Sequence, residues 1–238
     1  MKDAPVKLSV RNVCKTFRLR GSADGKTLLN VLRNVSFDVR QGEIVSLIGE
    51  SGCGKTTLLR IVQGLIRLDT GSINVDGNPV TKSGRDRGFG FQQASLLPWR
   101  SARANVEFGL ELQGMAKAER QERAMDLLKL VGLAHAANQY PHQLSGGMQQ
   151  RIGLARALAI DPAILLMDEP FSALDAQTRE VLQAELMRIH AATLKTTLFV
   201  THDLDEAIYL SDRVVVLAAK PGRVKKIIDI PFPHPRPE

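Results

Sequence analysis

Hydrophobic and polar positions along the first third of the chain favour strands followed by one helix. Residues 6–19 and 31–39 are rich in β-branched side chains and partly alternate, so we expect two strands with the polar segment 21–27 as a hairpin loop. The run 44–49 is continuously apolar, which is typical of a strand buried in a parallel sheet. Helical spacing over 56–66 follows a glycine-rich loop. The pattern therefore predicts a strand, a loop and a helix behind an N-terminal hairpin.

The middle and the last third of the chain follow different patterns. Asp76-Gly77 marks a hairpin within 72–80, and 88–93 favours a further strand. From about 101 to 160 the spacing of apolar residues is helical. Strands and helices alternate after that: we expect strands at 163–167, 196–201 and 213–218, and helices at 176–192 and 203–210.

The alternation of strands and helices predicts an α/β fold with a mostly parallel sheet. The first strands predict an N-terminal antiparallel β subdomain, and the helical stretch predicts an inserted α-helical subdomain over about 95–160. A length of 238 residues suits one domain, which we place at 6–230. The tail 231–238 contains four prolines and is expected to be extended or frayed.

Composition and charge narrow the class of protein. The 32 Lys and Arg residues exceed the 25 Asp and Glu residues, and a net charge of +7 admits nucleotides, nucleic acid or an anionic membrane surface as partners. With 5% aromatic residues, a stacking surface for single-stranded nucleic acid is not expected. Cys14 and Cys53 are too few for a disulfide framework or a four-ligand zinc site. No apolar stretch reaches transmembrane length, so we expect a cytosolic protein that meets a membrane through a partner.

The glycine-rich loop GESGCGKT fits the pattern G-x-x-x-x-G-K-[ST], between a buried strand and a helix. Glycines let successive backbone N–H groups point at one phosphate cluster, and the helix N-terminus adds partial positive charge. Lys55 would reach the β- and γ-phosphates, and Thr56 would offer a hydroxyl to Mg²⁺. The alternative is a glycine-rich turn with an unrelated lysine. The expected nucleotide-binding residues are Gly49, Glu50, Ser51, Gly52, Cys53, Gly54, Lys55, Thr56 and Thr57.

Two acidic residues follow a predicted buried strand. In ILLMDEP, Asp168 and Glu169 stand at the carboxyl end of the strand, where open α/β sheets place their ligand sites. Adjacent residues on a strand end point in different directions, so one carboxylate can hold Mg²⁺ while the other acts on a water molecule. The alternative is an acidic loop after a core strand.

A second glycine-rich helix start lies in LSGGMQQR. Ser145 is a natural N-cap, and the two glycines after it expose backbone N–H groups, which makes a second anion site. The alternative is a linker with a helix cap. Because one nucleotide does not need two separate cradles, we expect this one to serve a nucleotide held by another copy of the chain.

The segments GESGCGKT, FQQ, LSGGMQQR, ILLMDEP, SALD and VTHD, in that order, resemble the ATP-binding subunit of an ATP-binding-cassette (ABC) transporter. The resemblance covers about residues 6–230 and implies a P-loop NTPase core that binds ATP and Mg²⁺. The segment LLPW and the short chain are similar to importers of nitrate, sulfonate or taurine. The resemblance also implies a homodimer, transmembrane permease subunits, an external solute-binding protein, and a peripheral location on the cytoplasmic side of the inner membrane.

Residue roles follow from the same resemblance. Phe17 matches the aromatic residue that stacks on adenine, where the family more often has Tyr; a core Phe is the alternative. Glu169 matches the general base and His202 the residue that binds the γ-phosphate. Gln92 matches the glutamine that reaches Mg²⁺ and the attacking water, with Gln93 beside it. Three further groups are implied: Ser145, Gly146 and Gly147 on the γ-phosphate across the dimer, Asp175 coupling the two sites, and Thr56, Gln92 and Asp168 around the metal.

Two other features bear on partners. Leu96, Leu97, Trp99, Arg100 and Arg103 form a candidate docking surface for the permease, with core packing of Trp99 as the alternative. A non-transport ATPase of the same superfamily, acting on nucleic acid or the ribosome, is the alternative function. Such proteins carry a long coiled coil between the two glycine motifs or two cassettes in tandem, and this chain has neither pattern. Cys53 occupies a variable position of the phosphate loop, so a structural role is favoured over a redox role.

Overall fold

The computed structural model describes residues 4–18, 28–90, 95–234 and 236. These residues form two compact units. The first contains the described residues up to Gly84 and from Lys195 onward, and the second contains Arg85–Leu194. Each unit contains some of the predicted site residues.

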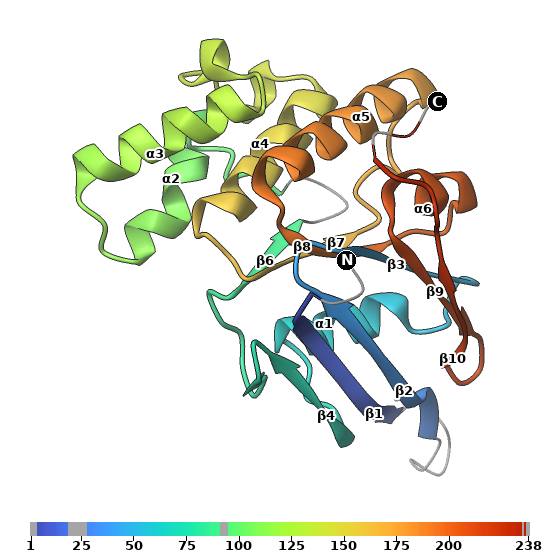
Figure 1. Cartoon of the computed structure of the whole chain (residues 1–238). Helices are drawn as coiled ribbons and strands as arrows, with labels where there is room; N and C mark the ends of the chain where they lie inside the picture. The colour runs from blue at the N-terminus through green and yellow to red at the C-terminus, as the bar shows by residue number, and fades with distance from the viewer. Residues whose placement is uncertain (1–3, 19–27, 91–94, 235, 237–238) are drawn as a thin grey trace. The chain divides into compact units, whose positions relative to one another are not determined.

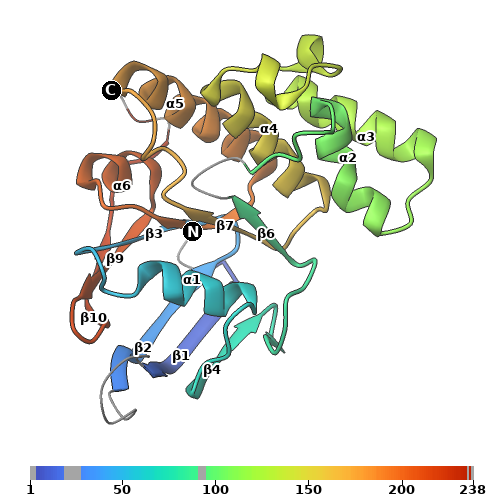
Figure 2. The same cartoon turned by 180° about the vertical axis from the view of Figure 1, so that it is seen from behind.

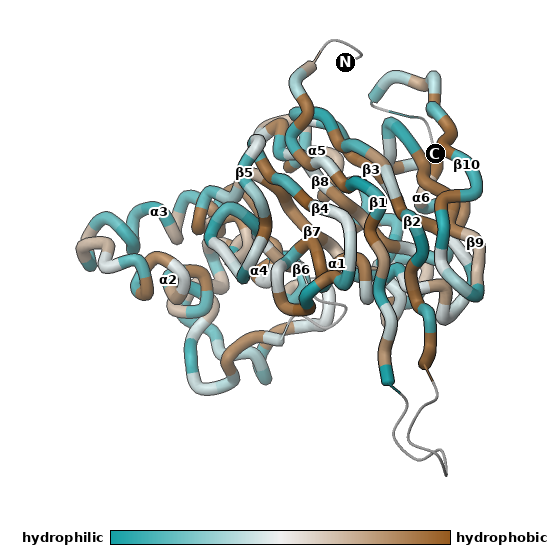
Figure 3. Tube along the Cα trace, turned by 90° about the horizontal axis from the view of Figure 1, so that it is seen from below, coloured by the Kyte–Doolittle hydropathy of each residue, from teal (hydrophilic) through white to brown (hydrophobic). Residues whose placement is uncertain are grey.

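An antiparallel sheet of order β2-β1-β4-β5 forms one layer of the first unit. Val10 on β1 pairs with Phe37 on one side and Ile73 on the other, and all three side chains are buried. Figure 3 shows hydrophobic and hydrophilic positions alternating along β1 and β2, as a sheet with one buried face requires. The predicted strands and the Asp76-Gly77 turn are confirmed; segment 21–27 lies outside the described residues. The strands are β1 (Val6–Arg18), β2 (Leu28–Arg40), β4 (Thr70–Val75) and β5 (Asn78–Pro79).

The first unit also contains a layer of strands in the order β10-β9-β3-β8. β3 pairs in parallel with β8 and β9, and β10 is antiparallel to β9. The continuous apolar run of β3 is buried, as predicted for a parallel strand covered on both faces. The sequence did not predict β10. The bounds are β3 (Ile44–Gly49), β8 (Thr196–Val200), β9 (Arg213–Ala218) and β10 (Arg223–Asp229).

Helix α1 (Lys55–Gln63) lies between β3 and the antiparallel strands in both Figures 1 and 2. It ends at Gly64, whose φ of 81° lets the backbone N–H return to the last carbonyls of the helix. A buried ion pair joins the layers of this unit: Arg213 donates to the Glu43 carboxylate and, at 2.7 Å, to the carbonyl of Asp38 on β2. The hydrogen bond to Glu43 raises the pKa of Arg213 above its usual value.

In its described residues, the second unit combines two parallel strands with four α-helices and two short 3-10 helices, Ala134–Ala136 and Pro141–Gln143. β6 and β7 pair through Gly88 and Leu165, and the helices follow the pattern predicted for residues 101–160 and 176–192. A Cβ at Gly109 would lie 2.5 Å from Ile160, so the glycine permits close packing of α2 beside the end of α4. The bounds are β6 (Arg87–Gly90), α2 (Ala102–Leu112), α3 (Lys117–Leu130), α4 (Gly146–Ala159), β7 (Ile164–Asp168) and α5 (Ala176–Thr193).

Helix α6 (Leu204–Leu210) and the tail complete the first unit. Residues 231–234 form neither helix nor strand, and Arg236 donates to the carbonyls of Tyr209 at 3.1 Å and of Ile208 at the end of α6. These carbonyls have no partner within a helix, so the guanidinium caps them. Among the described residues, none of the helices combines the length and the apolar character needed to cross a bilayer.

Candidate functional site

The glycine-rich loop of the first unit encloses a lysine ammonium group. Lys55 is the first residue of α1, and its Nζ donates to the carbonyls of Gly49 at 2.6 Å and Glu50 at 3.2 Å. The side chain is only 6% exposed. A positive charge held inside a loop at a helix N-terminus forms a binding site for an anion.

Gly54 gives the loop its shape. Its φ of 98° lies in the left-handed region, and a Cβ there would stand 2.7 Å from Leu32 Cδ2, so a side chain is excluded by both strain and space. Gly54 caps α1 without any side-chain hydrogen bond, and the first helical bond runs from the Leu58 N–H to the Gly54 carbonyl at 2.8 Å. The preceding N–H groups of the helix therefore have no intrahelical partner. Cys53 is 1% exposed, as a structural thiol would be.

His202 lies at the edge of the sheet from which the glycine-rich loop leaves. β3 and β8 are parallel neighbours, and the Thr201 N–H donates to the Leu47 carbonyl at 3.2 Å. After Thr201 the chain turns: the Asp203 N–H donates to the Thr201 hydroxyl at 3.0 Å, and Asp203 Oδ1 accepts from the Asp205 N–H at 2.9 Å. The turn leaves His202 exposed. The first unit thus places His202 after the end of β8, the parallel neighbour of the strand from which the glycine-rich loop leaves.

Phe17 lies near the end of β1, opposite Leu29 of β2. Its side chain is half-buried, and the Lys15 ammonium stands 5.3 Å from the centre of the ring. Lys15 is held by Asp69 at 2.7 Å. This cation beside the ring was not predicted, and a lysine two residues from an aromatic on the same strand face was the signal that could have indicated it.

The acidic pair lies in the second unit, at the end of β7. Asp168 is the last residue of the strand and Glu169 follows with a φ of 46°, which turns the chain sharply. The Glu169 carbonyl accepts from the Ser172 N–H at 3.2 Å and from the Ser172 hydroxyl at 2.9 Å. Both acidic side chains are partly exposed. The two acidic residues therefore stand at the carboxyl end of β7 and in the turn that follows it.

The second glycine-rich helix start is also in this unit. Ser145 caps α4 by accepting from the Met148 N–H at 3.3 Å, and Gly146 is exposed. A Cβ at Gly147 would lie 3.2 Å from Thr178 Cγ2 on α5. Asp175 caps α5 by accepting from the Thr178 N–H at 2.9 Å, and this backbone bond, with one from the Thr178 side chain, lowers the pKa of Asp175. The LSGG and SALD segments therefore adjoin each other through Thr178.

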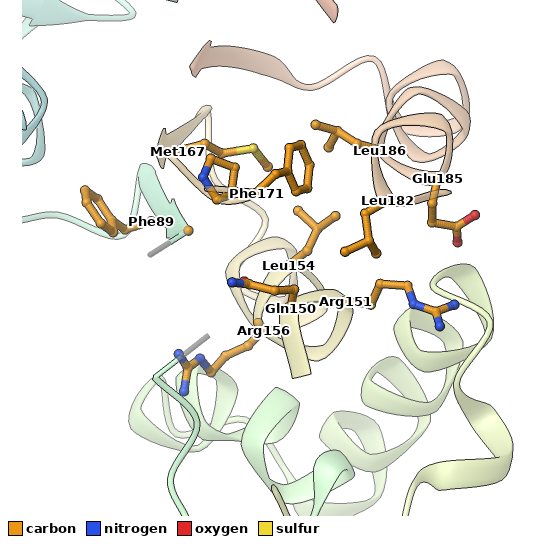
Figure 4. Close-up of a pocket in the computed structure, with 13 residues that line it drawn as sticks. Phe89, Gln150, Arg151, Leu154, Arg156, Met167, Phe171, Leu182, Glu185 and Leu186 are labelled. Carbon is orange, nitrogen blue, oxygen red and sulfur yellow. The ribbon is translucent and has the colours of Figure 1, made fainter. Parts of the chain in front are cut away.

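An apolar pocket lies behind α4 in the second unit. Figure 4 shows Leu154, Leu182 and Phe171 pointing toward one another, whereas the guanidinium groups of Arg151 and Arg156 lie at the edges. Such a lining suits a hydrophobic occupant rather than a phosphate group. Gln92 and Gln93 lie outside the described residues.

The oxygen donors predicted for a metal fit Mg²⁺. Mg²⁺ prefers hard oxygen ligands and is held in nucleotide sites by one or two protein oxygens plus phosphates. Thr56, in the first turn of α1, offers a hydroxyl, and Asp168, at the end of β7, offers a carboxylate. The described residues contain no cluster of three or more His, Cys, Asp or Glu side chains suited to a metal. Each oxygen, taken by itself, is of the kind that Mg²⁺ takes beside phosphate oxygens.

The loop, the enclosed lysine and the strand-to-helix connection define a P-loop nucleotide-binding protein. The family model for ABC transporters matches residues 32–172, and the chain belongs to that family. An uncharacterized ABC transporter ATP-binding protein of Methanocaldococcus jannaschii is 52% identical over 231 residues, covering 97% of this chain and 85% of the relative.

Two further relatives have names that specify a solute. A taurine import ATP-binding protein of Rhizobium johnstonii is 49% identical over 208 residues, covering 87% of this chain and 79% of the relative. A nitrate import ATP-binding protein of a Synechocystis species is 47% identical over 202 residues, covering 85% and 76%.

The fold has a close counterpart among solved structures. An ATP-binding cassette, solved as a dimer in a post-hydrolysis state with ADP and Pi, superposes with a TM-score of 0.80 at 35% identity, covering 94% of this chain and 99% of that chain. The predicted fold class, an ABC-type P-loop NTPase, is confirmed.

Proposed function

We propose that this protein is the ATP-hydrolysing subunit that energises solute import by an ABC transporter. The observation that carries the proposal is the buried Lys55 ammonium inside the glycine-rich loop, at the strand edge that also presents His202. A positive charge, a helix N-terminus and a nearby imidazole together suit a nucleoside triphosphate. The names of the relatives from R. johnstonii and Synechocystis support solute import as the process that ATP hydrolysis drives.

ATP binding falls mainly to the first unit. The N–H groups at the start of α1 and Lys55 offset the negative charge of the β- and γ-phosphates, and the Phe17 ring stacks on the adenine base. Thr56, Asp168 and Gln92 are the residues that would hold Mg²⁺, which would neutralise charge that develops on the phosphates.

Hydrolysis adds water to the γ-phosphorus. Glu169 accepts a proton from the attacking water as the new P–O bond forms, while the bond from the γ-phosphorus to the bridging oxygen breaks and leaves ADP. His202 donates a hydrogen bond to a γ-phosphate oxygen. Positioning and charge supply most of the catalysis in such a reaction.

A dimer supplies the remaining contacts. Ser145, Gly146 and Gly147 present an exposed helix start, which we assign to the γ-phosphate of a nucleotide held by a second copy. Asp175, which adjoins this helix start through Thr178, couples the two sites. The dimeric arrangement of the related cassette supports a homodimer built from one cassette per chain, residues 6–230.

The permease contact is assigned to the turn that carries Trp99. The indole is 71% exposed, so the core-packing alternative for this residue is wrong. Buried Asn105 fixes the turn, accepting from the Leu97 N–H at 2.8 Å and donating to the carbonyls of Leu97 and Arg100. A rigidly held, exposed Trp is suited to anchoring a partner. Leu96, Leu97, Arg100 and Arg103 complete the proposed docking surface.

The complete assembly contains permease subunits and an external solute-binding protein, with this chain peripheral on the cytoplasmic side of the inner membrane. Nitrate, a sulfonate such as taurine, or a related small solute is the proposed cargo. We assign the choice of that cargo to the permease and the solute-binding protein.

Phosphate release by the purified chain with ATP and Mg²⁺ tests the enzymatic part of the proposal. We expect release that depends on Mg²⁺ and is lost in Lys55→Ala; equal release by both proteins would overturn the site. Co-purification from membranes tests the transport part, with Trp99→Ala expected to lose the permease. Retention on DNA that weakens with salt would instead support the nucleic-acid alternative.

A further inference from the structure

The turn between β9 and β10 packs against the back of the glycine-rich loop, on the side of the α1 N-terminus (Figures 1 and 2). Gly222, in this turn, is buried and joined to β2 by two backbone bonds of 2.8 Å, from its N–H to the Val31 carbonyl and from the Arg33 N–H to its own carbonyl. A Cβ at Gly222 would lie 2.1 Å from the Cys53 carbonyl oxygen. Its φ is outside the left-handed region, so the restriction is steric.

The same hairpin contacts the other end of the loop. Gly49 pairs with Leu217 of β9, and a Cβ at Gly49 would lie 2.6 Å from the Leu217 carbonyl oxygen. The loop from Gly49 to Gly54 is therefore supported at its start by β9 and near its end by the turn that follows. Both supports are backbone atoms, which cannot move aside as a flexible side chain can.

Contact at the Cys53 carbonyl matters because a trans peptide is planar, with its C=O and N–H on opposite sides. The Cys53 carbonyl and the Gly54 N–H belong to one peptide. With the carbonyl directed at Gly222, the Gly54 N–H is directed to the opposite side, away from the β9–β10 turn. A side chain at position 222 would displace the Cys53 carbonyl oxygen and would therefore tilt the Gly54 N–H away from its present orientation.

We infer that Gly222 is a positioning residue for phosphate binding, because only a residue without a side chain lets the β9–β10 turn support the Cys53–Gly54 peptide in the phosphate-binding orientation. This inference rests on the proposed role of the glycine-rich loop. It assigns a function in the nucleotide site to a turn that follows the loop by almost 170 residues and carries no nucleotide-binding motif.

Gly222→Ala tests the inference in the full chain. We expect the dissociation constant for ATP, measured by titration with a fluorescent ATP analogue and competition by ATP, to rise about tenfold or more. The KM for ATP should rise in parallel, whereas kcat at saturating ATP stays within about twofold, because filling the site with ATP restores the loop. An unchanged dissociation constant overturns the inference.

Two matched variants separate positioning from general damage. Arg223→Ala changes the next residue, which is exposed, and should bind ATP as the wild type does. Val10→Ala opens a cavity in the antiparallel sheet and should lower the melting temperature without raising the KM. If Val10→Ala raises the KM as much as Gly222→Ala does at a similar loss of melting temperature, the effect is one of stability and the inference is wrong.

Hydrogen exchange of the wild-type chain decides the question if Gly222→Ala does not fold. Binding of ATP should slow exchange in a peptide spanning 217–223, where the Gly222 N–H bonds to Val31. Exchange there that is unchanged by ATP overturns the inference. A wild-type chain that does not bind ATP at all overturns the proposed function itself, and the inference with it.

Discussion

The two glycine-rich helix starts, at α1 in the first unit and α4 in the second, use the same chemistry in different settings. The start of α1 is capped by Gly54 without a side-chain bond, and beside it the buried Lys55 ammonium lies against loop carbonyls. The start of α4 is capped by the Ser145 hydroxyl, and Gly146 is exposed. One start is enclosed by its own unit, and the other is open.

This difference indicates which of the two helix starts needs a second copy of the chain in order to bind a phosphate. At α1 a lysine and neighbouring backbone surround the helix N–H groups, so a phosphate can be bound there without help. At α4 one N–H is already satisfied by Ser145, and a helix dipole in water contributes only about 0.3–1 kcal/mol to anion binding. An open cradle becomes effective when a second surface excludes water, which is the role proposed for the partner copy.

The largest expected effect concerns Glu169, which is needed for turnover and not for enclosure of the phosphate. Glu169→Gln keeps the size and polarity of the side chain but removes the base, so phosphate release should fall about 10²- to 10⁴-fold. ATP binding should persist, and the ATP-bound dimer should accumulate. Phosphate release and light scattering after gel filtration measure the two outcomes.

Asp168 provides the contrast for this variant. Asp168→Asn should weaken Mg²⁺-dependent nucleotide binding as well as turnover, because its carboxylate is assigned to the metal. Near wild-type turnover in Glu169→Gln would contradict the assignment of the base.

The open cradle at α4 is tested by adding charge to it. Gly146→Asp has room, since the nearest atom to a Cβ there is Leu174 Cδ2 at 4.0 Å, and a carboxylate at a helix start stabilises the helix. It should nevertheless repel a γ-phosphate brought by the partner and lower turnover by about 10²-fold. Gly146→Ala, which adds volume without charge, should retain turnover within about threefold.

Mixing inactive variants shows whether the two starts act across the dimer. An equimolar mixture of Lys55→Ala and Gly146→Asp should recover up to about a quarter of wild-type turnover, because half of the dimers contain one intact composite site out of two. No recovery would mean that both starts serve the same chain, and the comparison between an enclosed and an open cradle would lose its functional meaning.

Local patterns predicted most of the fold and the candidate site. The buried run of β3, the hairpin at Asp76-Gly77 and the helices of the second unit depend on neighbours in sequence, and so does the cap by Ser145. β10 was missed because Lys225 and Lys226 are both exposed at a register shift, which removes the alternation that marks a strand.

Contacts between distant segments could not be predicted. Nothing near Gly222 indicates that it meets the carbonyl of Cys53, since the contact depends on how β9, β3 and β2 are arranged. The ion pair of Lys15 with Asp69 likewise joins distant segments, because Asp69 comes from the segment leading into β4. Sequence patterns identify the groups that do chemistry more readily than the groups that hold them.

Two glycines with similar backbone conformations have different surroundings, so their alanine variants test whether ATP binding needs the close fit around Gly54. Gly54 and Gly77 have φ values of 98° and 76°, but a Cβ would meet Leu32 at Gly54 and open space at Gly77. Gly77→Ala should cost about 1–2 kcal/mol for its left-handed conformation and leave ATP affinity unchanged. Gly54→Ala should also weaken ATP binding by about tenfold or more, because the loop must shift. Equal ATP affinity in the two variants would show that the fit around Gly54 is not needed.

The smallest expected effect concerns the second unit, where the side chains of Ser145 and Asp175 cap α4 and α5. Hydrogen bonds from Thr178 lower the pKa of Asp175, so the charged cap stabilises α5 above the ordinary pKa of an aspartate, near 3.9. That contribution is lost as the pH falls through the lowered value. Asp175→Asn keeps an acceptor but no charge, so its melting temperature should lie slightly below that of the wild type at pH 7 and approach it as the pH falls through the lowered pKa of Asp175. A gap that stays constant from pH 7 to pH 3 would show that the charge of this cap does not stabilise the helix. Since α1 has no side-chain cap, stability that follows this titration belongs to α5 in the second unit and not to the enclosed cradle.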